Sequence, residues 1–301
     1  QRQMCIRDRY NKVYKTSYQL LPASNYDLGE GVSFKAGETQ ANGEITIKRE
    51  GMAVVDYLLP LQLGECSNNG VICQEEICYL KVGRTYTNPI ISDKSVPDPT
   101  VIRANDGYFY LYATQTSTYW MPIYRSKDLV NWEYQKTAFT QDTKPSLSGG
   151  GAFWAPEMTY INGKYVLYFS WAKMNGADVS YTAVAVSDSP LGPFPNSKAL
   201  ITNEEFGSNV IDQFYYEENG KKYMFFGSFK GIYVTELTDD GLSVKRDVDG
   251  MPVLKKQVCG NAFEGTNIYK KNGYYYLFAS IGNCCNGINL SLIHISEPTR
   301  P

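Results

Sequence analysis

The stretch "INGKYVLYFS" (161–170) has the pattern of a β-hairpin, because an Asn-Gly pair separates the end of one strand from an aromatic-rich second strand. Asn-Gly and Asp-Gly pairs favour two-residue hairpin turns, in which both turn residues take a positive φ. The same pattern occurs three more times, as "ANDGYFYLYAT" (104–114), "ENGKKYMFFGS" (218–228) and "KNGYYYLFAS" (271–280). The sequence therefore predicts four hairpins of one kind.

These hairpins are evenly spaced. Their turn glycines are Gly107, Gly163, Gly220 and Gly273, which gives a repeat of 53 to 57 residues. Further strand-like stretches lie inside the repeats, at 123–133, 183–194 and 231–244. One all-β unit per repeat of this length is typical of a β-propeller, in which each unit forms a blade. An all-β propeller with about four blades is therefore predicted.

An acidic residue stands at the start of the first strand in most repeats. Asp98 lies between two prolines in "VPDPTV", and the proline that follows it favours extended geometry at Asp98. The equivalent positions at 57-residue spacing are Ala155 and Asp212, and Glu264 follows 52 residues later. Because the first strand of each blade lines the central channel, we expect Asp98, Asp212 and Glu264 to form a ring of acids at one mouth of that channel.

The composition is that of a globular protein. The 301 residues are 43% hydrophobic and 14% aromatic, with 29 basic and 31 acidic residues and a pI of about 5.6. This near balance of charge gives no electrostatic basis for binding nucleic acid. No apolar run approaches the roughly 18–20 residues that cross a bilayer, so no transmembrane segment is expected.

Four segments are expected along the chain. Residues 10–84 lack the repeat and alternate short strands with Gly, Asn and Asp turns, which predicts a partial β-sandwich module. Residues 85–290 contain the repeats and form the propeller. The ends, 1–9 and 291–301, resemble translated sequencing adapters, so we expect the chain to stop inside the fourth blade and a secretion signal to have been lost.

Histidine chemistry has little support in this sequence. The only histidine, His294, lies in the second adapter-like end. A Ser-His-Asp or Cys-His nucleophile and a histidine-bound metal therefore have no histidine to use. None of the seven cysteines has the paired CxxC spacing of a zinc site. No metal-binding residue is identified.

Carboxylic acids at a channel mouth suit glycoside hydrolysis, which needs one acid to protonate the leaving oxygen and one carboxylate to activate water. Aromatic rings suit sugars, because the C–H face of a sugar is apolar. A carboxylate two residues beyond Ala155 and an adjacent cysteine pair at a strand end also lie near the predicted mouth. The residues expected to contact substrate are Trp120, Trp154, Glu157, Trp171, Cys284 and Cys285.

Five stretches carry a family resemblance: "VPDPTV", "WAPE", "SDSPLGPF", "NVIDQF" and "FEGTNIYKKNGYYYLFAS". They resemble the motifs of glycoside hydrolase family 43 over about residues 86–289. The resemblance implies a five-bladed β-propeller, incomplete here, and a plant-type polysaccharide or oligosaccharide substrate. It implies that Asp98 is the general base, Glu264 the general acid, and Asp212 the residue that orients the acid and tunes its pKa. Proline usually follows the middle aspartate of this family, whereas this chain has Gln213.

The hypothesis that follows is an inverting hydrolase of α-L-arabinofuranosyl linkages, in arabinan or in arabinoxylan side chains. A β-xylosidase and a retaining, fructan-cleaving propeller enzyme are the other enzymatic interpretations, although the Trp-Met-Asn-Asp-Pro motif of the fructan group is missing before Asp98. A non-catalytic glycan-binding propeller is the alternative outside enzymes, and it would not need all three acids. The resemblance also implies a secreted, periplasmic or cell-surface protein. The chemistry requires no cofactor, and Ca²⁺ in the channel, known in some relatives, stays open because the sequence shows no ligand set for it.

Overall fold

The computed structural model describes residues 2–29, 31–53, 55–64, 76–83, 90–92, 94–149, 151–173, 180–207, 209–282 and, for the backbone alone, 290–296. The chain divides into two compact units, residues 1–90 and 91–301. The predicted boundary between residues 84 and 85 falls in a stretch outside the described residues.

The first unit combines a helix, α1 (Arg2–Tyr14), and a 3-10 turn, η1 (Ala23–Asn25), with two small sheets. Leu21, Tyr57, Leu59 and Val82 form its buried core. The partial β-sandwich predicted for residues 10–84 and the adapter origin of residues 1–9, which lie largely in α1, stay predictions. One sheet has the order β1 (Gln19–Leu20), β4 (Tyr57–Leu61) and β5 (Cys78–Val82), and the other pairs β2 (Tyr26–Asp27) with β3 (Thr46–Ile47).

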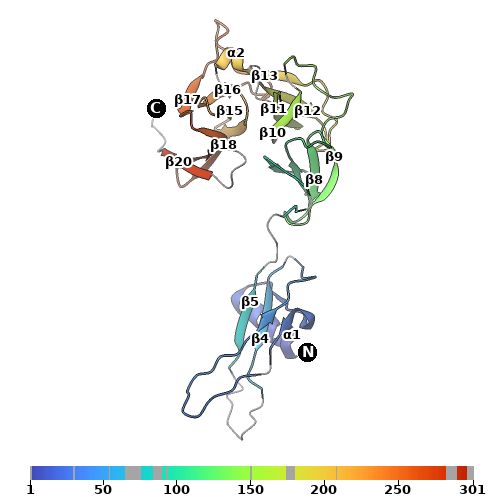
Figure 1. Ribbon diagram of the computed structural model, residues 1–301, viewed down its shortest axis with the longest axis vertical. Coiled ribbons are helices and arrows are strands. Elements are labelled where there is room, and N and C mark those ends of the chain that lie inside the picture. The colour runs from blue at the N-terminus through green and yellow to red at the C-terminus, as the bar shows by residue number, and fades with distance from the viewer. Residues whose placement is uncertain are drawn as a thin grey trace. The chain divides into compact units, whose positions relative to one another are not determined.

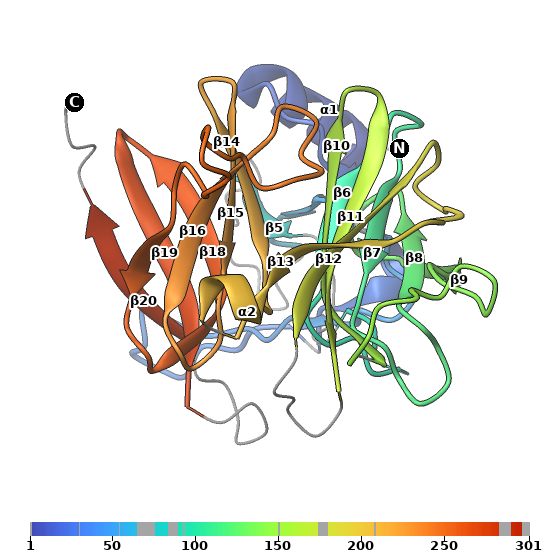
Figure 2. The ribbon, with the colours of Figure 1, turned by 90° about the horizontal axis from the view of Figure 1, so that it is seen from above.

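The second unit is an all-β propeller in which each sequence repeat forms one antiparallel sheet, which confirms the predicted fold class. Figure 1 shows the four sheets following one another in chain order, and Figure 2 shows them from above, from green through yellow and orange to red. The first blade contains β6 (Thr100–Arg103), β7 (Phe109–Tyr112), β8 (Pro122–Ser126) and β9 (Glu133–Thr137). The second contains β10 (Ala152–Ile161), β11 (Lys164–Ala172), β12 (Tyr181–Ser187) and β13 (Lys198–Thr202), with the short helix α2 (Asn203–Phe206) after it. The third contains β14 (Phe214–Glu218), β15 (Lys221–Phe226), β16 (Ile232–Leu237) and β17 (Lys256–Cys259), and the fourth contains β18 (Phe263–Lys271), β19 (Tyr274–Ile281) and β20 (Leu290–Ser296).

Turn chemistry sets the register of the blades. In the last three repeats the Asn and the Gly of the turn both have a positive φ, as a two-residue hairpin requires. The first repeat differs, because Ala104 and Tyr108 close a three-residue loop in which only Gly107 is left-handed. The two-residue turn predicted there is therefore wrong, since Asp106 has a negative φ and the loop is one residue longer.

Apolar side chains fill the spaces between the first and second blades and between the second and third. Tyr112 and Ile123 of the first blade pack with Phe153, Phe169 and Trp171 of the second. A second cluster joins the second blade to the third. The first strands of adjacent blades also contact one another, β6 with β10, β10 with β14 and β14 with β18. This packing places the starts of the first strands around a common axis, as the repeat predicts.

Candidate active site

A polar cavity of about 300 Å³ lies where the first strands of the blades begin. Asp98, Asp212 and Glu264 all line it, although they are far apart in the sequence and belong to different blades. All four described blades contribute to its wall. The other residues that line it are Pro99, Thr100, Ala155, Pro156, Glu157, Gln213, Phe214, Gly265, Thr266, Asn267 and Ser280.

The backbone repeats the same bend at this cavity in every blade. Asp98, Ala155, Asp212 and Gly265 have left-handed φ values of 49°, 36°, 56° and 64°. In each blade, the residue two positions after this bend pairs with the second strand. These pairs are Thr100 with Tyr112, Glu157 with Tyr168, Phe214 with Phe225 and Asn267 with Phe278. The extended geometry predicted for Asp98 is therefore wrong, because the turn into the strand overrides the local preference set by Pro99.

The position equivalent to Ala155 in the fourth blade is Gly265 rather than Glu264. Glu264 pairs with Ser280 on the second strand, just as Trp154 pairs with Ser170 in the second blade. The prediction from the repeat spacing is wrong by one residue here, because the repeats differ in length and only the strand register shows a one-residue difference. Glu264 is thus one residue earlier in its blade than Asp98 and Asp212 are in theirs. Because successive residues of a strand point to opposite sides, its side chain enters the cavity in a different direction from those of the two aspartates.

Asp98 is held in place but remains accessible. The hydroxyl of Thr114 donates a hydrogen bond to Oδ2 of Asp98 at 2.6 Å, and the same hydroxyl oxygen accepts the N–H of Ala155 at 2.7 Å. The Asp98 residue is exposed. A fixed and exposed carboxylate can accept a proton from water, which is what a general base must do.

Asp212 and Glu264 lie in a more enclosed part of the cavity. Burial, followed by the charges on Glu264 and Asp98, raises the pKa of Asp212 to about 7. Burial and the charge on Asp98 also raise the pKa of Glu264, whereas a 2.9 Å hydrogen bond from the Ser228 hydroxyl opposes the shift. A carboxylic acid whose pKa is raised stays protonated at higher pH and can act as a general acid.

Glu157 joins three blades. Its Oε2 accepts the Thr100 hydroxyl at 3.0 Å, and its Oε1 accepts the N–H of Tyr215 at 3.3 Å. Burial raises its pKa to about 7. The carboxylate lines the cavity but is engaged on both oxygens by protein groups. A structural role is therefore present alongside the predicted substrate contact, which stays a prediction.

Sequence reasoning missed the hydroxyl residues that support the acids. Thr114 and Ser228 donate to Asp98 and Glu264, and Ser170 accepts the N–H of Asp212. A signal for them was present, because each of the four quoted hairpins ends in Thr or Ser.

The tryptophans predicted to face a sugar differ in their environment. Trp171 is 2% exposed and packs on Phe153 in the core, so the predicted sugar contact is wrong for this ring. Trp154 is half-buried and occupies the register position that Glu264 has in the fourth blade. Trp120 is half-buried, with the ammonium of Lys144 5.0 Å from the centre of its ring. Cys284 and Cys285 lie outside the described residues.

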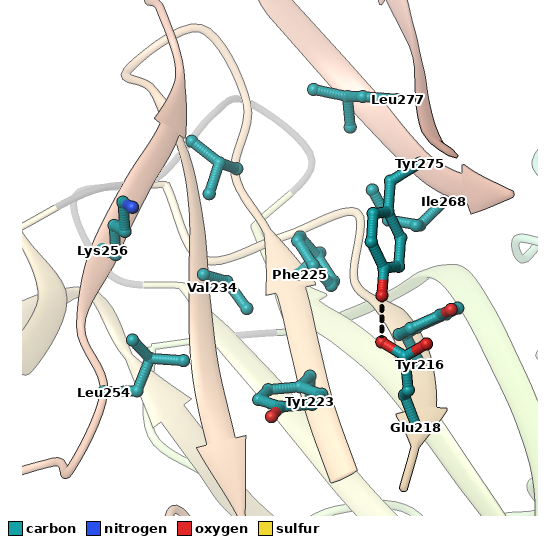
Figure 3. Close-up of a pocket in the computed structure, with 11 residues that line it drawn as sticks. Tyr216, Glu218, Tyr223, Phe225, Val234, Leu254, Lys256, Ile268, Tyr275 and Leu277 are labelled. Carbon is teal, nitrogen blue, oxygen red and sulfur yellow. Dashed lines mark hydrogen bonds between the residues drawn. The ribbon is translucent and has the colours of Figure 1, made fainter. Parts of the chain in front are cut away.

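A second cavity, of about 350 Å³, lies between the third and fourth blades and is mainly apolar. Figure 3 shows Phe225, Val234 and Leu277 lining it, with the Tyr275 hydroxyl directed at Glu218. Glu218 also pairs with Lys270, and these two hydrogen bonds lower its pKa. Acid–base hydrolysis needs two carboxyl groups, and this cavity offers a single one that is already paired. The polar cavity is the better candidate for an active site.

The described part of the chain contains no group of three or more His, Cys, Asp or Glu side chains arranged to hold a metal ion. Within the same residues, no helix has the length and apolar character needed to cross a membrane.

The comparison with protein families shows to which family this chain belongs. The family model of glycosyl hydrolases family 43 matches residues 86–301. This chain belongs to that family. A second model, described only as an N-terminal domain, matches residues 6–70.

Individual relatives agree with the family assignment. The chain is 30% identical over 208 residues to the extracellular endo-α-(1→5)-L-arabinanase 1 of Bacillus subtilis, a match that covers 66% of this chain and 63% of the relative. It is 30% identical over 223 residues to a xylan 1,3-β-xylosidase of a Vibrio species, covering 66% of this chain and 38% of that protein. Among solved structures, the family 43 endo-arabinanase from Bacillus licheniformis matches with a TM-score of 0.51 and 26% identity, over 66% of this chain and 69% of that one. This family 43 chain thus spans less than two thirds of the length of the arabinanase relative.

Proposed function

We propose that this family 43 protein hydrolyses α-L-arabinofuranosyl linkages, in arabinan or in arabinoxylan side chains, with inversion at the anomeric carbon. The observation that carries the proposal is the meeting of Asp98, Asp212 and Glu264, from three blades, at one polar cavity. Family membership and the similarity to an endo-arabinanase support the same substrate class.

The proposed roles follow from the surroundings of each acid. Asp98 is exposed and oriented by Thr114, so it takes a proton from water while the water oxygen attacks the anomeric carbon. Glu264, whose pKa is raised, gives its proton to the glycosidic oxygen as the bond between that oxygen and the anomeric carbon breaks. One proton is taken up and one is delivered, so the pair must be reset by solvent after each turnover.

Asp212 acts on the acid rather than on the substrate in this proposal. Its Oδ2 accepts the N–H of Gly265, the residue that directly follows Glu264. This hydrogen bond ties the carboxylate of the third blade to the strand that carries the acid. Burial and the charge on Asp98 raise the pKa of Glu264, and the charge on Glu264 in turn raises the pKa of Asp212, so the two acids interact. That the charge of Asp212 also raises the pKa of Glu264 stays part of the proposal.

The chemistry needs no cofactor, because the acid and the base are both side chains. We propose a secreted, periplasmic or cell-surface protein, and the similarity to an extracellular arabinanase from Bacillus subtilis supports this. Activity measured before and after chelation with EDTA, and again with added Ca²⁺, tests whether calcium contributes. Loss on chelation with recovery on calcium would show that a metal is needed.

A β-xylosidase is the second candidate, because the Vibrio relative has the same identity to this chain as the arabinanase. Turnover of nitrophenyl α-L-arabinofuranoside and nitrophenyl β-D-xyloside, together with release of oligosaccharides from linear arabinan, separates the two. We expect hydrolysis of the arabinose-containing substrates. Proton NMR of the first-formed sugar should show inverted anomeric configuration, and a retained configuration would remove Asp98 from the role of general base. Binding of arabinan without any turnover would instead indicate a glycan-binding propeller.

A further inference from the structure

We propose that Gln213 is a positioning residue that holds Asp212 in place through the hydroxyl of Ser170. The inference rests on the proposed function, since it concerns how one of the three acids is supported. Gln213 directly follows Asp212 at the entrance to β14.

A chain of hydrogen bonds links the four residues involved. Nε2 of Gln213 donates to the carbonyl oxygen of Ala155 on β10, and Oε1 of Gln213 accepts the hydroxyl of Ser170 on β11 at 3.0 Å. Oγ of Ser170 accepts the backbone N–H of Asp212 at 3.0 Å. Gln213 and Ser170 are both buried, at 5% and 0% exposure, so water does not compete for these groups. The chain of bonds runs from the second blade to the backbone of the acid on the third.

The direction of each bond follows from the groups available. The carbonyl oxygen of Ala155 only accepts, so the amide nitrogen of Gln213 must face it and the amide oxygen must face Ser170. That amide oxygen also only accepts, so the single hydroxyl proton of Ser170 points toward Gln213. A lone pair of the hydroxyl is thereby left for the N–H of Asp212. Gln213 thus sets the orientation in which Ser170 can hold Asp212.

The first blade has an equivalent hydroxyl, but its proton is donated to a different acceptor. There Thr114 takes the place of Ser170, accepting the N–H of Ala155 and donating its proton to the carboxylate of Asp98. In the second blade the residue at the position of Asp98 is Ala155, whose side chain offers no acceptor. Gln213 supplies the missing acceptor from the next blade.

The conformation of Asp212 makes this support important. Its φ of 56° lies in the left-handed region, which residues other than glycine seldom occupy unless their surroundings hold them there. Without Gln213 the buried hydroxyl of Ser170 would lose the acceptor for its proton. Loss of a partner by a buried polar group is costly, so the site would rearrange and Asp212 would move relative to Glu264.

The test compares Gln213→Met, Ser170→Ala and Ser170→Thr, with Gln257→Met as a matched control on the exposed surface. Ser170→Thr keeps the hydroxyl and has the residue that the first blade uses. Two measurements are made on each purified protein: residue-resolved hydrogen exchange of the Asp212 amide, and kcat and KM on nitrophenyl α-L-arabinofuranoside. Exchange does not depend on the substrate, so it tests the inference even if the proposed function is wrong.

In Gln213→Met and Ser170→Ala we expect exchange of the Asp212 amide to be at least about tenfold faster than in the wild type. We expect kcat to fall by about 10- to 100-fold with little change in KM, because a small displacement of an acid lowers turnover more than binding. Ser170→Thr and Gln257→Met should match the wild type in both measurements. Unchanged exchange in Gln213→Met and Ser170→Ala would overturn the inference, as would a loss in Ser170→Thr equal to that in Ser170→Ala. If Gln213→Met does not fold, the two Ser170 variants decide the question.

Discussion

The backbone N–H of Gly265 donates a hydrogen bond to Oδ2 of Asp212 at 3.2 Å. This bond connects the acid at the start of the third blade to β18, the strand that carries Glu264. Because burial and neighbouring acids raise the pKa values of both Asp212 and Glu264, these two carboxyl groups titrate as a coupled pair. The arrangement leads to four predictions that separate chemical roles from structural ones.

Glu264→Gln should show a strong dependence on the leaving group. An acidic phenol leaves without a proton, so activity on a dinitrophenyl arabinofuranoside should be largely retained, whereas activity on arabinan should fall by at least about 100-fold. Asp98→Asn is the matched comparison and should lose activity on both substrates, since water must be activated in each case. Equal losses of Glu264→Gln on both substrates would remove Glu264 from the role of general acid.

Ser228→Ala should move the pH profile of the enzyme. The hydroxyl of Ser228 stabilises the ionised form of Glu264 and so lowers its pKa, and removing the hydroxyl should raise that pKa further. Because the acid works in its protonated form, the basic limb of kcat/KM should shift to higher pH. Ser187→Ala, on β12 and away from the cavity, serves as the control. A basic limb that stays in place, or moves to lower pH, would contradict the assignment.

Glu157→Gln should change how stability depends on pH. Burial raises the pKa of Glu157 from 4.5 to about 7, so the folded state binds this proton more tightly than the unfolded state. The free energy of unfolding therefore falls as the pH rises from about 4.5 to about 7. The Gln side chain of the variant cannot ionise. Between these pH values the free energy of unfolding of the variant should therefore fall by about 1–2 kcal/mol less than that of the wild type. This figure is smaller than the full pKa shift implies, because water in the cavity screens the charge.

Denaturant unfolding of Glu157→Gln at pH 5 and pH 8 measures this difference. Glu204→Gln, an exposed substitution of the same kind, is the control and should follow the wild type. An equal loss in wild type and Glu157→Gln would show that Glu157 does not carry this dependence.

Substitutions of Trp154 and of Trp171 should have different effects, the first on substrate binding and the second on stability. Trp171 is buried against Phe153, so Trp171→Ala should lower the free energy of unfolding by about 3–5 kcal/mol, while Trp171→Phe should leave KM unchanged. Trp154 is half-buried at the register position of Glu264, so Trp154→Ala should raise KM for arabinan with a smaller effect on stability. The reverse pattern, with KM sensitive to Trp171→Phe alone, would show that the two rings have been assigned the wrong way round.

Much of the architecture could be predicted from the chain alone. The Asn-Gly turns and the aromatic-rich strands after them are local signals, because a two-residue hairpin constrains the residues that form it. Repetition of these hairpins placed the starts of the first strands around one axis, and with them Asp98, Asp212 and Glu264. Those three residues line one cavity for the reason that the repeat implied.

The sequence by itself determined the repeat, the all-β class and the three acids, since each depends on residues close together in the chain or on their spacing. Only the tertiary structure decided that Gly265 rather than Glu264 is the equivalent of Ala155, that Trp171 is core, and that Gln213 supports Asp212. These features depend on strand register and on contacts between blades. Such contacts join residues about one repeat apart, and their geometry is set by how the blades pack rather than by any local preference of the residues involved.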